Sequence, residues 1–124
     1  TIAAIFKEAG EDAFRKIERN MLHHFFKQDN FILSCGGGTP CFFNNIDHMN
    51  AHGVTIYLKS TPQQLARRLQ TEKETRPLIK DVEDALLEEF IEQKLSTRVE
   101  CYSKAMYHLP AQFISNENFE RIKY

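Results

Sequence analysis

The stretch FILSCGGG, residues 31–38, decides the fold class because a short apolar run passes directly into three glycines. We predict a short buried strand at Phe31 to Ser34 and a loop at Gly36 to Gly38. Three successive residues without a Cβ expose backbone N–H groups that can donate to a hydroxyl, a carboxylate or a phosphate. A tight turn is the alternative interpretation of the glycines. Open α/β sheets bind ligands at this place, outside the carboxyl ends of their strands.

Helical and strand patterns alternate on both sides of this stretch. Apolar residues recur at three- and four-residue spacings before it, and a second short apolar run, typical of a buried strand, follows it. Thr1, and Thr61 with Pro62, are typical of helix starts, and Gly10 and Gly53 are typical of helix ends. The predicted elements are helices at 2–9, 11–27 and 45–52, a strand at 54–58, a helix at 63–69, a long helix at 82–106, a strand within 106–115 and a helix at 116–124. Strands alternating with helices predict an α/β domain with a parallel sheet.

Composition and charge exclude several classes of protein. The 124 residues are 42% hydrophobic and 27% charged, which is typical of one globular domain. A formal charge of -1 disfavours binding to nucleic acid or to an anionic membrane surface. No apolar run reaches the roughly 18 residues that a membrane helix needs, so we expect a soluble protein of the cytoplasm.

Cysteines and histidines show no pattern of a metal or covalent site. Cys35, Cys41 and Cys101 are odd in number and lack C-x-x-C spacing, so we expect reduced thiols. His48 and His52 have the spacing of a helical metal pair, but the glutamate of an H-E-x-x-H motif and a third ligand are missing. We therefore predict no metal site within the chain and no covalent catalysis.

An arginine interrupts the apolar stripe of the long predicted helix. Leu87, Ile91, Leu95, Arg98 and Tyr102 follow one another at helical spacings, which places the guanidinium on the face that otherwise meets the core. Burial of an unpaired charge costs several kcal/mol, so Arg98 needs an anion. That anion is either an internal carboxylate or an anionic ligand, and the planar guanidinium suits a carboxylate or a phosphate.

Further arginine positions indicate a binding site only in combination with their neighbours in the sequence. Arg15 lies three residues before Glu18, which could orient it toward a site, although exposed helical pairs of this kind are common. Arg76 is followed by a proline in a charge-dense segment, where we expect a mobile lid that closes over a ligand. Arg67 and Arg68 precede that segment, and one of them could stack on a base. Solvated surface arginines are the alternative for all of these residues.

Four motifs together resemble the shikimate kinase family. They are T-I-A-A-I-F…G-E…F-R-x-x-E at 1–18, S-C-G-G-G-T-P at 34–40, R-P-L at 76–78 and L-x-x-R-x-x-x-Y at 95–102, in the family's order. The resemblance implies a P-loop kinase with a three-layer α/β/α architecture around a parallel sheet. It also implies transfer of the γ-phosphoryl group of ATP, with Mg²⁺, to the 3-hydroxyl of shikimate in aromatic amino-acid biosynthesis.

Site roles follow from the resemblance residue by residue. Arg15 and Arg98 match the two arginines that grip the shikimate carboxylate, and Glu18 would orient Arg15. The glycines Gly36, Gly37 and Gly38 match the loop that contacts the substrate ring. Arg76 matches the lid arginine that reaches the ATP phosphates and assists catalysis, and Arg68 is assigned to the nucleotide side.

One departure from the family is large. The sequence G-x-x-x-x-G-K-[ST] occurs nowhere in the 124 residues, nor does the strand–helix–strand unit that carries it in the family. That unit includes the family's first strand, which lies between the strands that we predict at 31–34 and 54–58. We therefore expect the 124 residues alone to bind ATP poorly and not to turn over, and we expect an upstream segment in the natural protein.

The resemblance divides the chain into four parts. We assign residues 1–53 to shikimate binding, 54–71 to a core strand and helix, 72–84 to the lid and 85–124 to the C-terminal core. The expected partner is a small molecule rather than a nucleic acid or a membrane, and we expect a monomer. A related small-molecule kinase, such as gluconate kinase, and a non-catalytic carboxylate-binding module are the alternatives.

Overall fold

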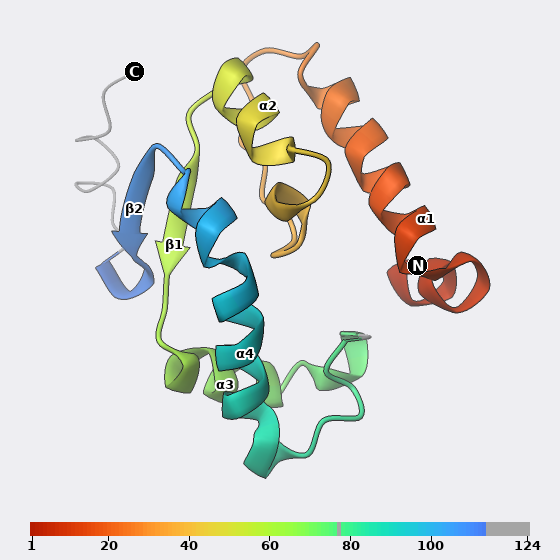
Figure 1. The fold of residues 1–124 in the computed structure, drawn as a ribbon, viewed down its shortest axis with the longest axis vertical. Coiled ribbons are helices and arrows are strands. Elements are labelled where there is room, and N and C mark those ends of the chain that lie inside the picture. Colours follow the sequence, from red (N-terminus) through yellow and green to blue (C-terminus); the bar gives the residue numbers. More distant parts are fainter. Residues whose placement is uncertain (77, 114–124) are drawn as a thin grey trace.

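Helices and one small parallel sheet make up the part of the chain that the structure, a computed structural model, describes, residues 1–76 and 78–113. Helix α1 lies on one side of the molecule and the sheet on the other, with the 3₁₀ helix η1 and helix α2 between them (Figure 1). The elements are α1 (Ile2–Phe25), η1 (Thr39–Cys41), α2 (Asn45–His52), β1 (Ile56–Lys59), α3 (Pro62–Gln70), η2 (Lys73–Thr75), α4 (Asp84–Ser103), β2 (Tyr107–Pro110) and η3 (Ala111–Phe113).

Capping residues fix the helix ends as the sequence predicts. The Thr1 side chain accepts from the N–H of Ala4, and Gly10 has a φ of 81°, so the two predicted N-terminal helices form one helix kinked at this glycine. Thr61 caps α3 in a capping box, with Pro62 as the first helical residue. Helix α2 ends at Gly53, as expected.

The sheet contains two strands in the described residues, and the strand predicted at 31–34 is wrong. Strands β1 and β2 run parallel, with Ile56 opposite Tyr107 and Lys59 opposite Pro110. Residues 31–34 form no strand, and the Ile32 side chain is 99% exposed. A strand needs a neighbour that takes up its backbone hydrogen bonds, and no strand in the described residues lies beside this segment. Strand β1 is itself only partly buried, in contrast to the prediction.

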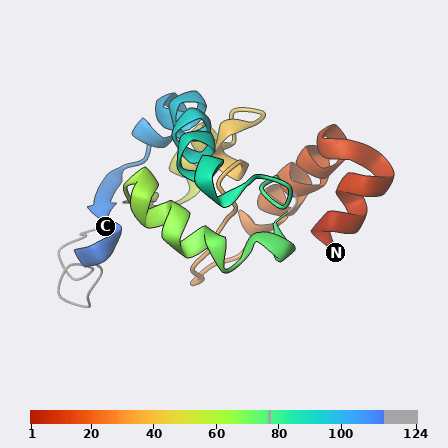
Figure 2. The ribbon, with the colours of Figure 1, turned by 90° about the horizontal axis from the view of Figure 1, so that it is seen from below.

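The main apolar core lies between α3, α4 and the segment that joins them. Figure 2 shows these elements from below. Leu87 is fully buried there, together with Ala66, Ile79 and Ile91. The stripe predicted for the long helix is thus confirmed at its N-terminal half. Ile79 ties the charge-dense segment 72–84 to this core, a contact that the sequence interpretation did not anticipate.

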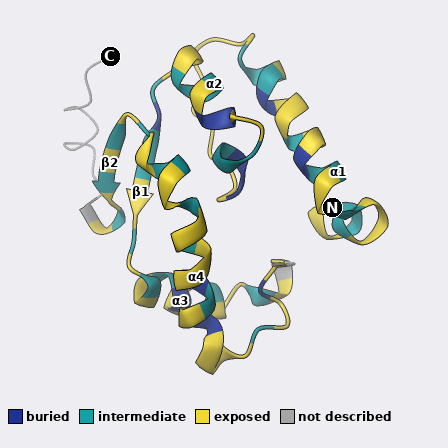
Figure 3. Cartoon of the chain, in the orientation of Figure 1, coloured by how far each residue is buried: buried dark blue, intermediate teal, exposed yellow. Residues whose placement is uncertain are grey.

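A second buried region surrounds the junction of α1, η1 and α2, where Figure 3 colours residues of all three elements as buried. It contains the polar or charged residues Arg15, Thr39 and Asn45 beside the apolar Leu22 and Ile46. Buried polar groups need hydrogen-bond partners, so this region is a candidate binding site.

The helix predicted at 116–124 lies outside the described residues. Among the described helices, none combines the length and the apolar character needed to cross a membrane.

Candidate functional site

Arg15 is the most buried charged side chain of the described residues. Its side chain is 5% exposed on α1, and its guanidinium donates to Glu11 through Nε and Nη2 and to Glu18 through Nη1. The ring of Phe42 lies 4.3 Å from its Cζ atom, at cation–π distance. Two of the five N–H groups of Arg15 therefore remain open within the described residues. The prediction of a guanidinium oriented by Glu18 agrees with this geometry.

A hydrogen-bond chain connects Arg15 to the segment after the glycines. Glu18, which binds Arg15 at 2.9 Å, accepts a 2.5 Å hydrogen bond from the Thr39 hydroxyl. The Thr39 carbonyl in turn accepts from the side-chain amide of the fully buried Asn45 at 2.8 Å. Sequence reasoning missed Thr39, Asn45 and Glu11. Thr39 follows the glycines directly in the quoted motif, so its position was a usable signal, whereas nothing in the sequence marks Asn45.

Gly37 and Gly38 leave the space in which two arginines meet the loop. A Cβ on Gly38 would lie 2.5 Å from both Nη atoms of Arg15, and a Cβ on Gly37 would lie 2.9 Å from Nη1 of Arg98 and from the Tyr102 hydroxyl. By contrast, a Cβ on Gly36 would meet its neighbours at 3.6 Å or more, an ordinary contact. A side chain at position 37 or 38 would therefore displace side chains of α1 or α4 that lie in the Cβ direction, most of all the buried Arg15 beside Gly38.

Open donors converge at this loop. In the described part of the chain, the N–H groups of Gly37 and Gly38 donate to no other group, and no carboxylate pairs with Arg98. Arg98 and Tyr102 lie one helical turn apart on α4, so both reach the same side of the loop. Arg98 has no internal ion pair in the described residues. This favours an anionic ligand for its guanidinium over an internal salt bridge. Guanidinium and amide donors at one loop suit a carboxylate ligand.

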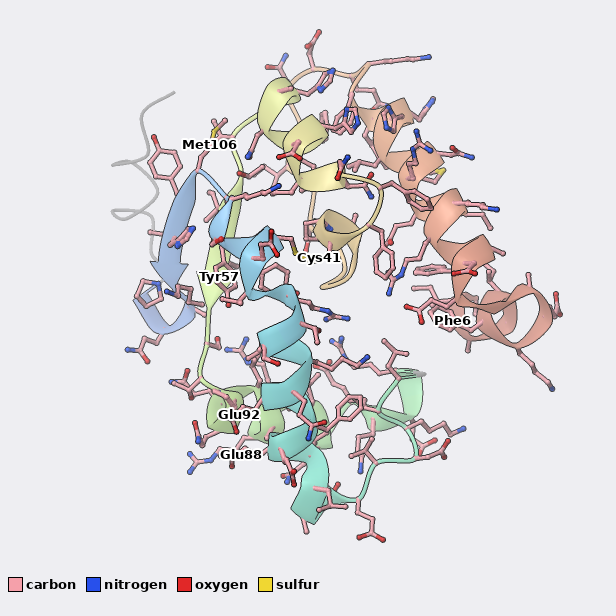
Figure 4. The ribbon with its side chains drawn as sticks, in the orientation of Figure 1. Phe6, Cys41, Tyr57, Glu88, Glu92 and Met106 are labelled. Carbon is pink, nitrogen blue, oxygen red and sulfur yellow. A yellow bond between two sulfur atoms is a disulfide. The ribbon has the colours of Figure 1, made fainter. Side chains whose placement is uncertain are left out.

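Two cysteines join the loop to α4, which corrects the expectation of reduced thiols. Cys41 at the end of η1 forms a disulfide with Cys101, one residue before Tyr102 on α4. Their Cα atoms are 5.4 Å apart, inside the usual range for a disulfide, and sequence spacing cannot show such a long-range approach. Cys41 lies beside the C-terminal part of α4, as does Tyr57 of β1 (Figure 4).

Cys35 forms no disulfide in the described residues. The pKa of its thiol is raised, mainly by partial burial and further by the Glu18 carboxylate.

Comparison with known proteins identifies the family. A family model described as "Shikimate kinase" matches residues 1–122. The chain belongs to the shikimate kinase family. A shikimate kinase of Parabacteroides distasonis is 44% identical over 94% of this chain and 68% of its own length, and one of Bacteroides thetaiotaomicron is 43% identical over 86% of this chain and 61% of its own. A crystal structure of shikimate kinase from Bacteroides thetaiotaomicron matches with a TM-score of 0.84 at 40% identity, over 97% of this chain and 69% of the solved one.

These shikimate kinases confirm the predicted α/β fold class and the family, and they do not favour a gluconate kinase. The chain spans about two thirds of the length of the curated relatives that it matches.

Two arginines that the family resemblance assigns to the nucleotide lie in other elements. Arg68 of α3 lines an open pocket of about 390 Å³ together with Arg67, Ser60, Gln64 and Gln112. Arg76 follows η2 and forms an exposed ion pair with Glu72 at 2.7 Å. The structure thus brings Arg15, Arg98 and the glycines together but leaves these two arginines outside that cluster.

The fit of ATP and Mg²⁺ to the described residues is partial. The guanidinium and amide groups of the Arg67–Arg68 pocket can stack on or hydrogen-bond to a nucleotide. The G-x-x-x-x-G-K-[ST] sequence that would hold the phosphates and Mg²⁺ is not among these 124 residues. In residues 1–76 and 78–113, no group of three or more His, Cys, Asp or Glu side chains could hold a metal ion.

Proposed function

We propose that the protein containing this chain transfers the γ-phosphoryl group of ATP to the 3-hydroxyl of shikimate. The observation that carries this proposal is the approach of Arg15 and Arg98 to Gly38 and Gly37, one arginine from each side of the glycine loop. Shikimate carries one carboxylate on a hydroxylated ring. Two guanidinium groups with a row of open amides are the donors that such a molecule needs.

In the proposed site, this chain binds and orients the acceptor. Arg15 offers its two open N–H groups beside Gly38, while Glu11 and Glu18 hold its remaining donors. Arg98 approaches from α4 without a carboxylate partner in the described residues. A carboxylate held between the two guanidinium groups would fix the ring, so that its 3-hydroxyl has one orientation toward the phosphoryl donor.

Nucleotide binding is the less complete half of the proposal. ATP supplies the phosphoryl group, and its charge must be neutralised during transfer. We assign Arg68 to the nucleotide because it lines the α3 pocket. Arg76 is our candidate for the lid arginine, since its exposed ion pair with Glu72 contributes little and can exchange for a phosphate. A monomeric state and a location in the cytoplasm stay predictions.

Titration of shikimate into the natural-length protein and its variants tests the proposal. Arg98→Ala should weaken shikimate binding by about 2 kcal/mol, roughly thirtyfold, because one charge-assisted contact is lost. The matched control is Arg19→Ala, an exposed arginine one turn beyond Arg15 on the same helix, which should leave the affinity unchanged. Methyl shikimate, which lacks the negative charge, should bind weakly to the native protein and lose little more in the Arg98 variant.

Kinase activity is measured in the same preparations by shikimate-dependent release of ADP. Shikimate binding without phosphoryl transfer would support the non-catalytic module instead. Equal shikimate affinity in native protein and Arg98→Ala would contradict the proposed site.

A further inference from the structure

Tyr102 has no role in the proposed function so far, yet its hydroxyl makes a close contact between α4 and the glycine loop. Its hydroxyl donates to the carbonyl oxygen of Gly37 at 2.5 Å, across 65 positions of sequence. The Tyr57 ring of β1 packs against the Tyr102 ring with centroids 4.8 Å apart. The disulfide of Cys101 holds the adjacent residue of α4 to η1. The Tyr102 hydroxyl is therefore held in place from two sides.

The contact fixes the orientation of one particular peptide group. The Gly37 carbonyl and the Gly38 N–H belong to the same peptide unit, which is trans, so the two groups point in opposite directions. With the carbonyl bound to Tyr102, the Gly38 N–H must point to the side of the loop away from Tyr102. Gly38 is buried, and its N–H has no hydrogen-bond partner in the described residues, so a ligand that reaches the loop can satisfy this donor.

Without the tyrosine hydroxyl, this peptide group would have little to hold it. Both flanking residues are glycines, which adopt many backbone conformations at similar free energy, so rotation of the peptide plane between them meets little steric resistance. A rotated peptide would present a carbonyl oxygen where the amide had been. That oxygen would repel a carboxylate or the lone pairs of a hydroxyl.

We propose that Tyr102 is a positioning residue that orients the Gly37–Gly38 peptide and thereby directs the Gly38 amide toward shikimate. The inference rests on the proposed function for the identity of the ligand. It goes beyond that function by making the amide orientation depend on a side chain of α4. Because Tyr102 lies one turn after Arg98, the same helix supplies a guanidinium and sets the amide.

Tyr102→Phe in the natural-length protein is the direct test, because it removes only the hydroxyl. We expect the KM for shikimate to rise about fivefold to tenfold, the value of one hydrogen bond, while the KM for ATP and the thermal unfolding midpoint stay unchanged. The matched control is Tyr57→Phe, which removes the hydroxyl of the neighbouring ring and should leave both KM values unchanged. Equal loss of all kinetic parameters together with a lowered unfolding midpoint would overturn the positioning role in favour of a structural one.

A measurement without ligand separates this inference from the proposed function. In ¹⁵N-labelled protein, Tyr102→Phe should shift or broaden the amide resonance of Gly38, and Tyr57→Phe should not. An unmoved Gly38 resonance with unchanged shikimate affinity would overturn the inference. If native protein binds no shikimate, the proposed function fails, and the Gly38 resonance alone then decides whether Tyr102 orients the peptide.

Discussion

Adding one methyl group at Gly38 should damage the site more than the same change at any other glycine of the loop. The Cβ of Gly38→Ala would lie 2.5 Å from Nη1 and Nη2 of Arg15 and 2.7 Å from its Cζ atom. Favourable contacts between such atoms begin at about 3.5 Å, so the guanidinium must retreat by about 1 Å. Arg15 cannot simply swing away, because its side chain is 5% exposed and is bound to both Glu11 and Glu18.

The magnitude follows from the contacts that such a retreat disturbs. Displacement by about 1 Å breaks at least one charge-assisted hydrogen bond of Arg15, which is worth about 1.5–3 kcal/mol. If the carboxylate of shikimate loses the same amount, its affinity falls about tenfold to a hundredfold. Overpacking at the same point also lowers the free energy of unfolding by about 1–3 kcal/mol.

Alanine substitutions at the other glycines supply graded controls. A Cβ on Gly37 would lie 2.9 Å from Arg98 and Tyr102, so Gly37→Ala should also weaken binding. Gly36→Ala makes only contacts of 3.6 Å and longer and should be mild. Gly53→Ala meets nothing within 4 Å and has extended backbone, with a φ of -175°, so binding and stability should stay native.

Isothermal titration with shikimate and thermal unfolding measure the two effects separately. Native affinity in Gly38→Ala, or an equal loss in Gly36→Ala, would refute the reasoning. A double-mutant cycle with Arg15→Lys checks the route of the effect. If the methyl group acts through Arg15, the losses in Gly38→Ala and Arg15→Lys are not additive.

The remaining predictions concern the disulfide and a histidine. Reduction of Cys41–Cys101, which closes a loop of 60 residues, should lower the free energy of unfolding by up to about 4 kcal/mol, and alkylation should find one thiol before reduction and three after it. The pKa of His23 is lowered from 6.5, mainly by burial and further by the charges of His48, Arg19 and His52. Protons therefore bind more tightly to the unfolded chain, and the free energy of unfolding falls as the pH drops below 6.5. Urea unfolding at about pH 8 and about pH 5 should show a smaller acid loss in His23→Gln than in the exposed control His24→Gln; equal losses would contradict this cause.

Local features of the fold were predictable from the sequence. The caps at Thr1 and Thr61 and the interruption of helical backbone at Gly10 depend on residues within one or two turns. The burial of Leu87 and Ile91 followed from helical periodicity alone. In each case the determining partners lie close in sequence, so a pattern of residue types contains the information.

Features that depend on distant partners were not predictable in the same way. The run at 31–34 has the composition of a buried strand, but strand formation depends on a neighbour that the run itself cannot reveal. The disulfide links residues 60 positions apart, and the hydrogen bond from Thr39 to Glu18 spans 21. The roles proposed for Arg15, Gly38 and Arg98 came from family motifs, and the approach of the two arginines to the glycine loop became visible only in three dimensions.

The charges around the loop indicate how a site of this kind can select its ligand. Arg15 and Arg98 contribute two positive charges, and Glu11 and Glu18 contribute two negative ones, so the four groups together are formally neutral. A neutral cluster does not attract anions by its overall field. Selectivity must therefore come from the directions of the open donors on Arg15, Arg98 and the glycine amides, which act over hydrogen-bond distance. If the proposed function holds, such a site would distinguish a carboxylate of the right shape from other small anions as long as the peptide between Gly37 and Gly38 keeps its orientation.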